Sequence, residues 1–446
     1  MTDDQAWIGE TMGGTVTRFE RTAVGSSRGT WLVDVTKPSG EVLTLVLRRD
    51  TGDGPLSNTE LSLQREAVVY RALAGTPVRI PRLRAVAPDG QALLVERAAG
   101  SADFAALSGG ERAKVADDFL HALAELHAVD PAKLDLPGFA RPASPEEHAL
   151  LDLDLWERVY TGRVKRPSPL ARFTFAWLRA HPPRHVERTV LCHGDVGPGN
   201  FMFEGGRVSA VLDWEFAHLG DPMDDVAWLT IRGHHLLGFG DQARDLARYS
   251  ELSGLAVDPG RVRYYQAFVL LRMLVSCLVA LDRRDGKMNV STYFALIPVL
   301  ERLLPPVLAA MAGVAAPPAV LPAPGDGGEV GEVADTVLND LVRVVIPAVT
   351  DPAVTARAGG MAMLLAHVST AQRLGPAIEA AELEDLATVL GKRPATVAEG
   401  AAALDAFVRE HGAGEALIPY LSRRGERSLA TWPAAASAVA QPLRAL

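Results

Sequence analysis

The segment Leu191-Cys-His-Gly-Asp-Val-Gly-Pro-Gly-Asn200 is followed closely by Val208-Ser-Ala-Val-Leu-Asp-Trp-Glu215. In the first segment, Gly and Pro between Asp195 and Asn200 favour a tight loop that turns the asparagine back toward the aspartate. In the second, an apolar run typical of a buried strand ends at Asp213. Each feature alone is common in turns and strand ends. Together they predict one place where two carboxylates and an amide meet.

These residue types fit phosphoryl transfer. That reaction needs a carboxylate beside the attacking hydroxyl and oxygen ligands for Mg²⁺ bridging the phosphates. We expect Asp195 to be the catalytic carboxylate. We expect Asn200 and Asp213 to be the metal ligands, because Mg²⁺ prefers hard oxygen ligands and few protein contacts. Glu215 is a candidate for a further ligand or for an acceptor beside the ligands.

The order H-G-D-x-x-x-x-N followed by D-W-E resembles the signature of the aminoglycoside phosphotransferase and choline kinase-like families. These families are relatives of the protein kinases. The resemblance covers about residues 10–300. It implies an α+β, protein-kinase-like bilobal fold, with a small β-rich N-lobe and a mostly helical C-lobe.

The stretch His218-Leu-Gly-Asp-Pro-Met-Asp-Asp-Val-Ala-Trp228 resembles the family's G-D-P-x-x-D-L-A continuation. The resemblance implies that Asp221 and Asp225 are structural and tie the loop to a helix. His193 likewise resembles a structural loop residue, and an ordinary packed histidine is the simpler interpretation for it.

The N-terminal part is expected to bind the nucleotide. Gly25, Ser26 and Ser27 lie between two predicted strands, and such small residues let backbone N–H groups approach phosphates. No G-x-G-x-x-G is present here, and most such runs are hairpin turns. In the family, a Lys at the end of the next strand pairs with the phosphates and with a Glu on the following helix. This chain has Arg48 in that place and Glu66 as the plausible partner.

Arg48 has an alternative interpretation, and two stretches near it resemble further parts of the family pattern. Arg48 could be an ordinary surface residue of its strand, since successive strand residues face opposite sides. Its V-L-R-R strand end also resembles one branch of the family, the phosphotransferases associated with acyl-CoA dehydrogenases. Glu96 and Ala98 lie in a stretch that resembles the interlobe hinge, whose backbone would contact adenine.

The resemblance implies two lobes, and the composition of the remainder adds a linker and a helical domain, so four parts are expected. Residues 1–98 are the predicted N-lobe, with strands at 30–35, 42–47 and 92–96 and one helix at 61–73. Residues 99–304 are the predicted C-lobe, mostly helical, with short strands near 190–191 and 208–212. A Pro/Gly-rich linker is predicted over 305–331. Residues 332–446 form a predicted all-helical domain, with a role in packing, oligomerisation or docking of a protein partner.

Composition limits the remaining possibilities. Of 446 residues, 48% are hydrophobic and 22% charged, as in ordinary soluble domains. The formal net charge of −9 disfavours nucleic acid as a partner. The two cysteines, Cys192 and Cys277, suggest no disulfide framework or zinc site. The start of the chain lacks signal-peptide features. The apolar stretch 264–281 contains Gln266 and Arg272, so we expect a buried helix, no membrane association and a cytoplasmic protein.

The function predicted is transfer of the γ-phosphate of ATP, with Mg²⁺, to a hydroxyl of a small-molecule acceptor. The dehydrogenase-associated branch implies a hydroxyacyl (CoA-type) or similar acceptor. Two alternatives stay open. Arg48 and the weak phosphate loop would also suit a pseudokinase-like nucleotide-binding module. Asp195, Asn200 and Asp213 around Mg²⁺ would also suit a metal-dependent phosphohydrolase.

Overall fold

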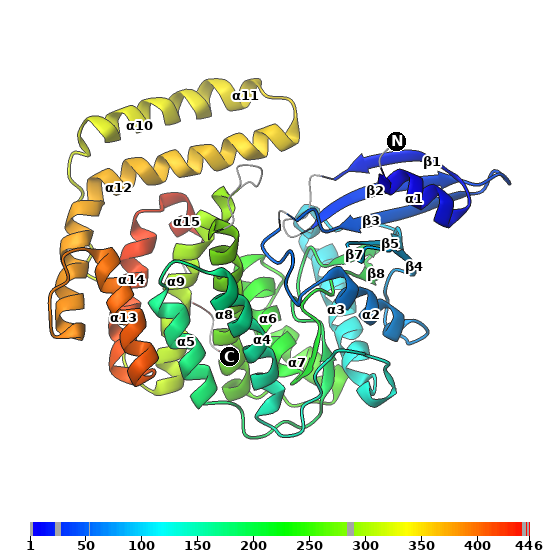
Figure 1. Ribbon diagram of the computed structural model, residues 1–446, viewed down its shortest axis with the longest axis horizontal. Helices are drawn as coiled ribbons and strands as arrows, with labels where there is room; N and C mark the ends of the chain where they lie inside the picture. The colour runs from blue at the N-terminus through cyan, green and yellow to red at the C-terminus, as the bar shows by residue number, and fades with distance from the viewer. Residues whose placement is uncertain (1–2, 23–27, 53, 283–289, 439–442, 444–445) are drawn as a thin grey trace. The chain divides into compact units, whose positions relative to one another are not determined.

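The computed structural model describes residues 3–22, 28–52, 54–282, 290–438, 443 and 446 (Figure 1). Two compact units make up the chain. The first contains residues 1–152, 183–265 and 446, and the second contains residues 153–182 and 266–445. Each unit is described separately below.

The first unit begins with an antiparallel sheet of five strands in the order β1-β2-β3-β5-β4. Helix α1 (Asp3–Met12) precedes the sheet, and α2 (Leu63–Leu73) lies between its third and fourth strands in the chain. The strands are β1 (Thr15–Arg21), β2 (Gly29–Thr36), β3 (Val42–Arg49), β4 (Leu83–Val86) and β5 (Ala92–Glu96).

The two faces of this sheet have different partners. Val33 and Val35 of β2 and Leu45 and Leu47 of β3 are fully buried in one cluster with Ile8 of α1. Because side chains alternate along a strand, the residue after Leu47 faces the opposite side. Arg48 therefore points toward α2 rather than toward α1. The alternation thus places this guanidinium on the face that carries the site.

The rest of the first unit is mostly helical and carries two short pairs of strands. In the pairs, β6 (Val190–Cys192) is antiparallel to β9 (His218–Gly220), and β7 (Phe201–Glu204) is antiparallel to β8 (Arg207–Val211). The helical elements are η1 (Phe104–Ala106), α3 (Gly109–Ala128), η2 (Pro131–Lys133), α6 (Met223–Trp228), the π-helical η3 (Leu229–Leu236) and α7 (Gln242–Ser253). Helices α4 (Glu147–Arg163) and α8 (Pro259–Asp282) each run from one unit into the other.

The first unit differs from the sequence prediction mainly in short elements. The strands predicted near 30–35, 42–47 and 92–96 are present, as is the helix predicted over 61–73. The sequence analysis expected one helix in the first hundred residues, whereas α1 is a second one. Only Ile8 of α1 is fully buried, so the helix has little apolar periodicity to reveal it.

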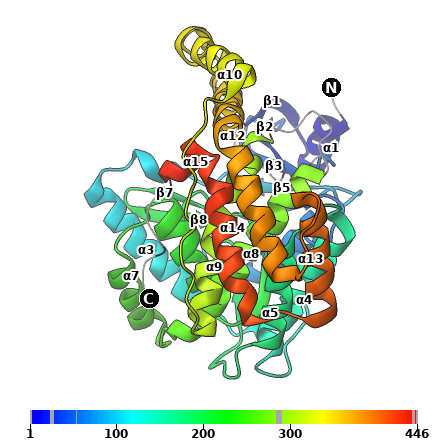
Figure 2. The ribbon, with the colours of Figure 1, turned by 90° about the vertical axis from the view of Figure 1, so that its left-hand side faces the viewer.

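The second unit is helical. Helix α9 (Ser291–Ala312) packs along α14 (Ile418–Ala430), as Figure 2 shows. This close approach requires Gly425, because a Cβ there would lie 2.1 Å from the carbonyl oxygen of Glu301. The other elements are α5 (Pro169–Ala180), α10 (Gly328–Asp340), η4 (Leu341–Val345), α11 (Ile346–Ala348), α12 (Pro352–Leu390), α13 (Val397–His411), η5 (Glu415–Leu417) and α15 (Pro433–Ala438).

The predicted linker is shorter in the structure. Helix α9 continues through Pro305 and Pro306, and α10 begins at Gly328, so both helices enter the range 305–331. A proline in a helix removes one backbone hydrogen bond. Burial of Pro305 and of neighbouring apolar side chains offsets that loss.

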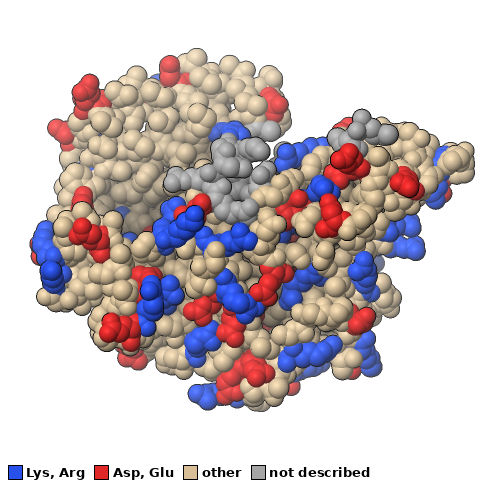
Figure 3. Space-filling view, in the orientation of Figure 1, with Lys and Arg blue, Asp and Glu red and all other residues tan. Residues whose placement is uncertain are grey.

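Helices α10 and α12 lie side by side as a hairpin and are joined by an ion pair of 2.7 Å between Arg373 and Asp335. The face of this hairpin in Figure 3 carries few charged side chains. Valines at helical spacing are exposed on α10 and on η4, which follows it. They include Val330, Val333, Val337, Val344 and Val345.

Among the residues that the structure describes, two helices, α8 and α9, are long and apolar enough to cross a membrane. Of the most apolar window, 89% is buried inside the structure for α8 and 56% for α9. The prediction that residues 264–281 form a buried helix is thereby confirmed.

The packing of α9 on α14 makes Gly425→Ala a sharp test of the second unit. The added methyl group would collide with backbone, so we expect the unit to lose about 1–3 kcal/mol of stability. Hydrogen exchange followed by mass spectrometry should show faster exchange in α9 and α14.

Gly359→Ala is the matched control. Gly359 is an exposed position of α12, and a Cβ there would meet nothing within 4 Å. Alanine favours a helix over glycine, so this variant should be stabilised by up to about 1 kcal/mol. Equal exchange in both variants would contradict the packing of α9 against α14.

Candidate active site

The loop between β6 and β7 carries the predicted catalytic residue, Asp195, and one of the two predicted metal ligands, Asn200. The amide nitrogen Nδ2 of Asn200 donates to Oδ2 of Asp195 at 2.6 Å and to its backbone oxygen at 2.8 Å. Gly197 (φ +145°) and Gly199 (φ +93°) adopt backbone angles that favour glycine. The loop therefore returns on itself, as the sequence predicted, and brings Asp195 and Asn200 into direct contact.

Asp225, in the first turn of α6, anchors this loop. Its carboxylate accepts hydrogen bonds from the backbone N–H groups of His193 at 2.7 Å and Gly194 at 2.8 Å. It also lies 3.0 Å from Nε2 of His127. Burial would raise the pKa of Asp225, but the partners, His127 first among them, bring the pKa below its ordinary value. The residue is therefore a charged anchor inside the core.

His193 joins the loop to the end of β8. Its Nδ1 accepts from the backbone N–H of Asp195 at 3.2 Å, so its Nε2 carries the proton and donates to the carbonyl of Leu212 at 2.7 Å. Gly194 (φ +80°) is required beside it, since a Cβ there would lie 2.4 Å from the carbonyl oxygen of Phe216. The loop and the strand end are thus held as one piece.

Asp221 has a similar structural environment. It is fully buried, accepts from the backbone N–H of Met223 at 3.0 Å, and lies 3.3 Å from Nη1 of Arg261. Burial raises its pKa to about 6. These contacts hold the segment between β9 and α6.

Asp213 lies just beyond β8 with its backbone in the left-handed region (φ +65°), which is uncommon for a residue other than glycine. Its Oδ1 is 2.8 Å from Nη2 of Arg48, and the other terminal nitrogen of Arg48 pairs with Glu66. Burial would raise the pKa of Asp213, and Arg48 more than compensates, so the net shift is downward. The side chain of Arg48 is only 11% exposed, so it is not a surface residue of its strand.

Glu215 continues the same cluster. Its nearest cation is Arg28, whose Nε lies 3.9 Å from Oε2 of Glu215, while Nη1 of Arg28 lies 3.2 Å from Asp50. Burial, followed by the negative charge of Asp213, raises the pKa of Glu215 to about 8. Burial is thus the main reason that the charged form of Glu215 is disfavoured.

Arg232 completes the site from η3. Its Nε is 3.2 Å from Oδ1 of Asp195, and its Nη2 donates to Oδ1 of Asn200 at 3.4 Å. Burial raises the pKa of Asp195, and Arg232 opposes that rise. Sequence analysis missed both Arg232 and Arg28. Neither belongs to the H-G-D or D-W-E motif, and arginine is common on protein surfaces, so no spacing marked them.

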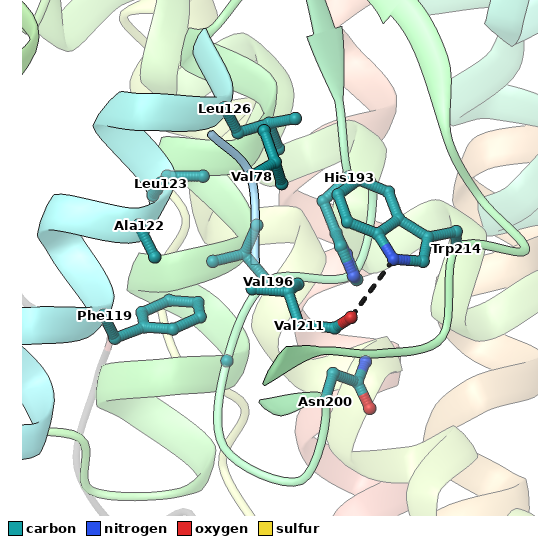
Figure 4. A pocket seen from close by; sticks show the side chains of 11 residues that line it. Val78, Phe119, Ala122, Leu123, Leu126, His193, Val196, Asn200, Val211 and Trp214 are labelled. Carbon is teal, nitrogen blue, oxygen red and sulfur yellow. Dashed lines mark hydrogen bonds between the residues drawn. The ribbon is translucent and has the colours of Figure 1, made fainter. Parts of the chain in front are cut away.

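Behind the loop lies a small apolar cavity, shown in Figure 4 with Leu123 and Leu126 of α3 opposite His193 and Trp214. The rings of His193 and Trp214 are 4.6 Å apart, and the indole N–H donates to the carbonyl of Val211 at 3.3 Å. The cavity measures about 10 Å³, the size of a single water. It serves as packing behind the loop rather than as an acceptor site.

The remaining nucleotide-site predictions are less well defined. Gly25, Ser26 and Ser27 lie outside the described residues. Glu96 ends β5 and pairs with Arg84 at 2.5 Å, and Ala98 is half-buried in the segment after it. The ion pair of Glu96 and the burial of Ala98 do not test a contact with adenine. The hinge role of these two residues therefore stays a prediction.

The site was tested for its fit to a divalent cation. Asp213 and Asn200 offer hard oxygen atoms, and the carboxyl group of Glu215 lies beside Asp213 in the same buried cluster. Within the described part of the chain, no group of three or more His, Cys, Asp or Glu side chains forms a metal site by itself. Mg²⁺ commonly uses only one or two protein carboxylates, together with substrate phosphates and water. The residues present therefore fit Mg²⁺ bound together with a phosphate ligand.

Comparison with known proteins now defines the class. The model of the phosphotransferase enzyme family matches residues 18–265, more than half of the chain. The chain belongs to this family. The resemblance deduced from the H-G-D and D-W-E motifs is confirmed.

A solved structure from Ralstonia eutropha JMP134, named as an aminoglycoside phosphotransferase by assignment only, shares 25% identity and a TM-score of 0.50. It covers 69% of this chain, and the match spans 96% of its own length. The protein-kinase-like fold expected from the sequence is therefore also confirmed.

Curated relatives point to a particular branch. Acyl-CoA dehydrogenase family member 10 of Mus musculus is 29% identical over 195 residues, which is 41% of this chain and 18% of the mouse protein. Acyl-CoA dehydrogenase family member 11 of Gallus gallus is 31% identical over 113 residues, 25% of this chain and 14% of the chicken protein. The chain thus matches less than a fifth of the length of these two relatives.

The anchoring role of Asp225 predicts a specific stability profile. Asp225→Asn removes a buried charge with several partners and should cost about 3 kcal/mol near neutral pH. The folded-state pKa lies below the ordinary value, so the carboxylate's contribution is present above about pH 5 and is lost as pH falls through the folded pKa. The difference between wild type and variant in denaturant unfolding should therefore be constant from about pH 6 to 8 and shrink below about pH 4.

Asp117→Asn provides the control for this experiment. The Asp117 carboxylate is 55% exposed and pairs with Arg248 at 2.8 Å on the surface. Its loss should change stability by no more than about 0.5 kcal/mol. A similarly small effect of Asp225→Asn at neutral pH would contradict the anchoring role.

Proposed function

We propose that this chain transfers the γ-phosphoryl group of ATP, with Mg²⁺, to a hydroxyl of a small-molecule acceptor. The observation that carries the proposal is the joint placement of Asp195, Asn200 and Asp213 beside Arg48. A carboxylate for the acceptor hydroxyl, two oxygen ligands for a metal and a cation for phosphate converge on one site. The pseudokinase-like alternative is a module that binds a nucleotide without transferring phosphate. Nucleotide binding alone gives no reason for a carboxylate at the position of Asp195.

In the proposed reaction, the acceptor oxygen bonds to the γ-phosphorus while the bond from that phosphorus to the β–γ bridging oxygen breaks, and ADP leaves. The acceptor's hydroxyl proton passes to a carboxylate oxygen of Asp195. Asn200 and Asp213 would hold Mg²⁺, which supplies neutralisation of charge on the phosphate oxygens. Arg48 is held between Asp213 and Glu66, where the rest of its fork of N–H donors suits phosphate oxygens.

Arg48 also bears on the pseudokinase-like alternative. Its pairing with Glu66 reproduces the cation–carboxylate pair expected from the family resemblance, with a guanidinium in place of the ammonium group. Guanidinium groups bind phosphate bidentately, so this substitution does not by itself imply loss of activity. The phosphohydrolase alternative lacks a specific supporting observation, because no group of three or more His, Cys, Asp or Glu side chains among the described residues forms an all-protein metal cage.

The acceptor class is proposed from the branch. The curated relatives are named as acyl-CoA dehydrogenases, and the chain matches only a small part of each. A phosphotransferase of this branch would act on a compound that also suits acyl-CoA chemistry. We therefore propose a hydroxyacyl compound, of CoA type or a similar metabolite, as the acceptor.

The C-terminal helices are proposed to mediate self-association or to bind a protein partner. The exposed valines of α10 and η4 support this proposal, because contiguous apolar surface is commonly covered by another protein.

Asp195→Asn tests the catalytic assignment. We expect kcat for phosphate transfer to a hydroxyacyl acceptor to fall roughly 10²- to 10⁴-fold, because the amide cannot accept the hydroxyl proton. Binding of Mg·ATP, measured by calorimetry, should change little. Phosphate transfer is measured as the formation of ADP that depends on added acceptor.

Asp117→Asn again serves as the surface control and should retain full activity. Undiminished transfer by Asp195→Asn would contradict its role. Nucleotide binding by the wild type without transfer across a panel of hydroxyacyl compounds, sugars and amino alcohols would favour the binding module. Release of phosphate from monoesters without ATP would favour the phosphohydrolase.

A further inference from the structure

Arg232 contacts both the proposed catalytic carboxylate and a proposed metal ligand. Its Nε lies 3.2 Å from Oδ1 of Asp195, and its Nη2 donates to Oδ1 of Asn200 at 3.4 Å. It comes from η3, a π-helical segment, whose wide turns occur frequently at functional sites. No motif recognised in the sequence includes it.

The loop is shaped around this guanidinium. A Cβ at Gly197 would lie 3.1 Å from Nη1 of Arg232, and a Cβ at Gly199 would lie 3.5 Å from its Nη2. Both glycines have positive φ, and the side chain of Arg232 is only 19% exposed. The backbone of the loop therefore packs directly on the guanidinium, which limits how far either group can move.

Arg232 also determines how the amide of Asn200 is turned. The Nδ2 side of that amide donates to two oxygens of Asp195, so the Oδ1 side faces Arg232. In the opposite orientation, the NH₂ group of the amide would face the N–H donors of Arg232, and the amide oxygen would face the oxygens of Asp195. That orientation is therefore unfavourable. The planar fork of an arginine can reach both Asp195 and Asn200 at once, whereas the single ammonium group of a lysine is a point charge.

We propose that Arg232 is a positioning residue for phosphoryl transfer, whose guanidinium fixes the Asp195 carboxylate and the Asn200 carbonyl oxygen relative to one another. This inference rests on the proposed function. Arg232 acts through Asp195, which touches the reacting hydroxyl, and through Asn200, which touches the metal. Small misplacements of such groups reduce rates strongly, by about 10²-fold for a shift of about 1 Å.

The test compares Arg232→Gln and Arg232→Lys with wild type in acceptor-dependent ADP formation. We expect Arg232→Gln to lower kcat roughly 10- to 100-fold while the KM for the acceptor changes less than about twofold. Arg232→Lys should recover only part of the loss, because it keeps the charge but not the fork. Added methylguanidine should raise the kcat of Arg232→Gln by filling the vacated position.

A second readout does not depend on turnover. Binding of Mn²⁺ in the presence of ADP, followed by electron paramagnetic resonance, should weaken several-fold in Arg232→Gln, because Asn200 is no longer held in one orientation. Arg248→Gln is the control: Arg248 lies on the surface, where it pairs with Asp117 and Glu251 at 2.8 Å each. It should match wild type in both measurements.

The outcomes separate the inference from the proposed function. Transfer by wild type with an unchanged kcat in Arg232→Gln overturns the inference alone. A rise in acceptor KM with unchanged kcat also overturns it, since that result marks direct contact with the acceptor. A loss that neither lysine nor methylguanidine reduces, together with a lowered melting temperature, marks a structural role and overturns it too. If wild type itself transfers no phosphate, the proposed function fails and the inference fails with it.

Discussion

The structure depends on bringing several buried carboxyl groups and arginines together at one place. Burial of a carboxylate is costly unless cations and hydrogen bonds compensate it. Segments distant in the sequence therefore have to meet: a sheet strand, a helix, two loop segments and a π-helical turn. The carboxylates are Glu66, Asp195, Asp213 and Glu215, and the arginines that face them are Arg28, Arg48 and Arg232. The pKa of Glu215 is raised to about 8, first by burial and then by the negative charge of Asp213.

A second set of buried polar groups makes this arrangement rigid. Asp225 holds the backbone of the loop, and His193 ties the loop to the end of β8. Because these bonds use backbone groups, they fix the loop's shape without occupying the side chains of Asp195 and Asn200. Structural contacts and proposed chemistry are therefore assigned to different residues: Asp225 and His193 hold the loop, and Asp195 and Asn200 keep their side chains for the reaction.

Local sequence was enough to predict the loop, because Gly and Pro between Asp195 and Asn200 leave few other conformations. It was also enough to predict Asp213 at a strand end. The pairing of Arg48 with Glu66 came from the family resemblance, because strand alternation alone left open which face Arg48 occupies. Arg232 and Arg28 could not be predicted, because their partners lie far away in the sequence and only the fold brings them together. Pro305 and Pro306 misled the linker prediction, since burial within the second unit outweighs their local preference. The acceptor remains a proposal because no local pattern encodes a pocket formed by distant helices.

The central claim is that Asp213 and Asn200 hold Mg²⁺ together with a nucleotide. Calorimetric titration of ADP into wild type and Asp213→Ala, each with and without Mg²⁺, tests it most directly. The account predicts that wild type binds ADP more tightly with Mg²⁺ and that Asp213→Ala loses this dependence. ADP binding that is independent of Mg²⁺ in wild type, or equally dependent on Mg²⁺ in both proteins, would contradict the account.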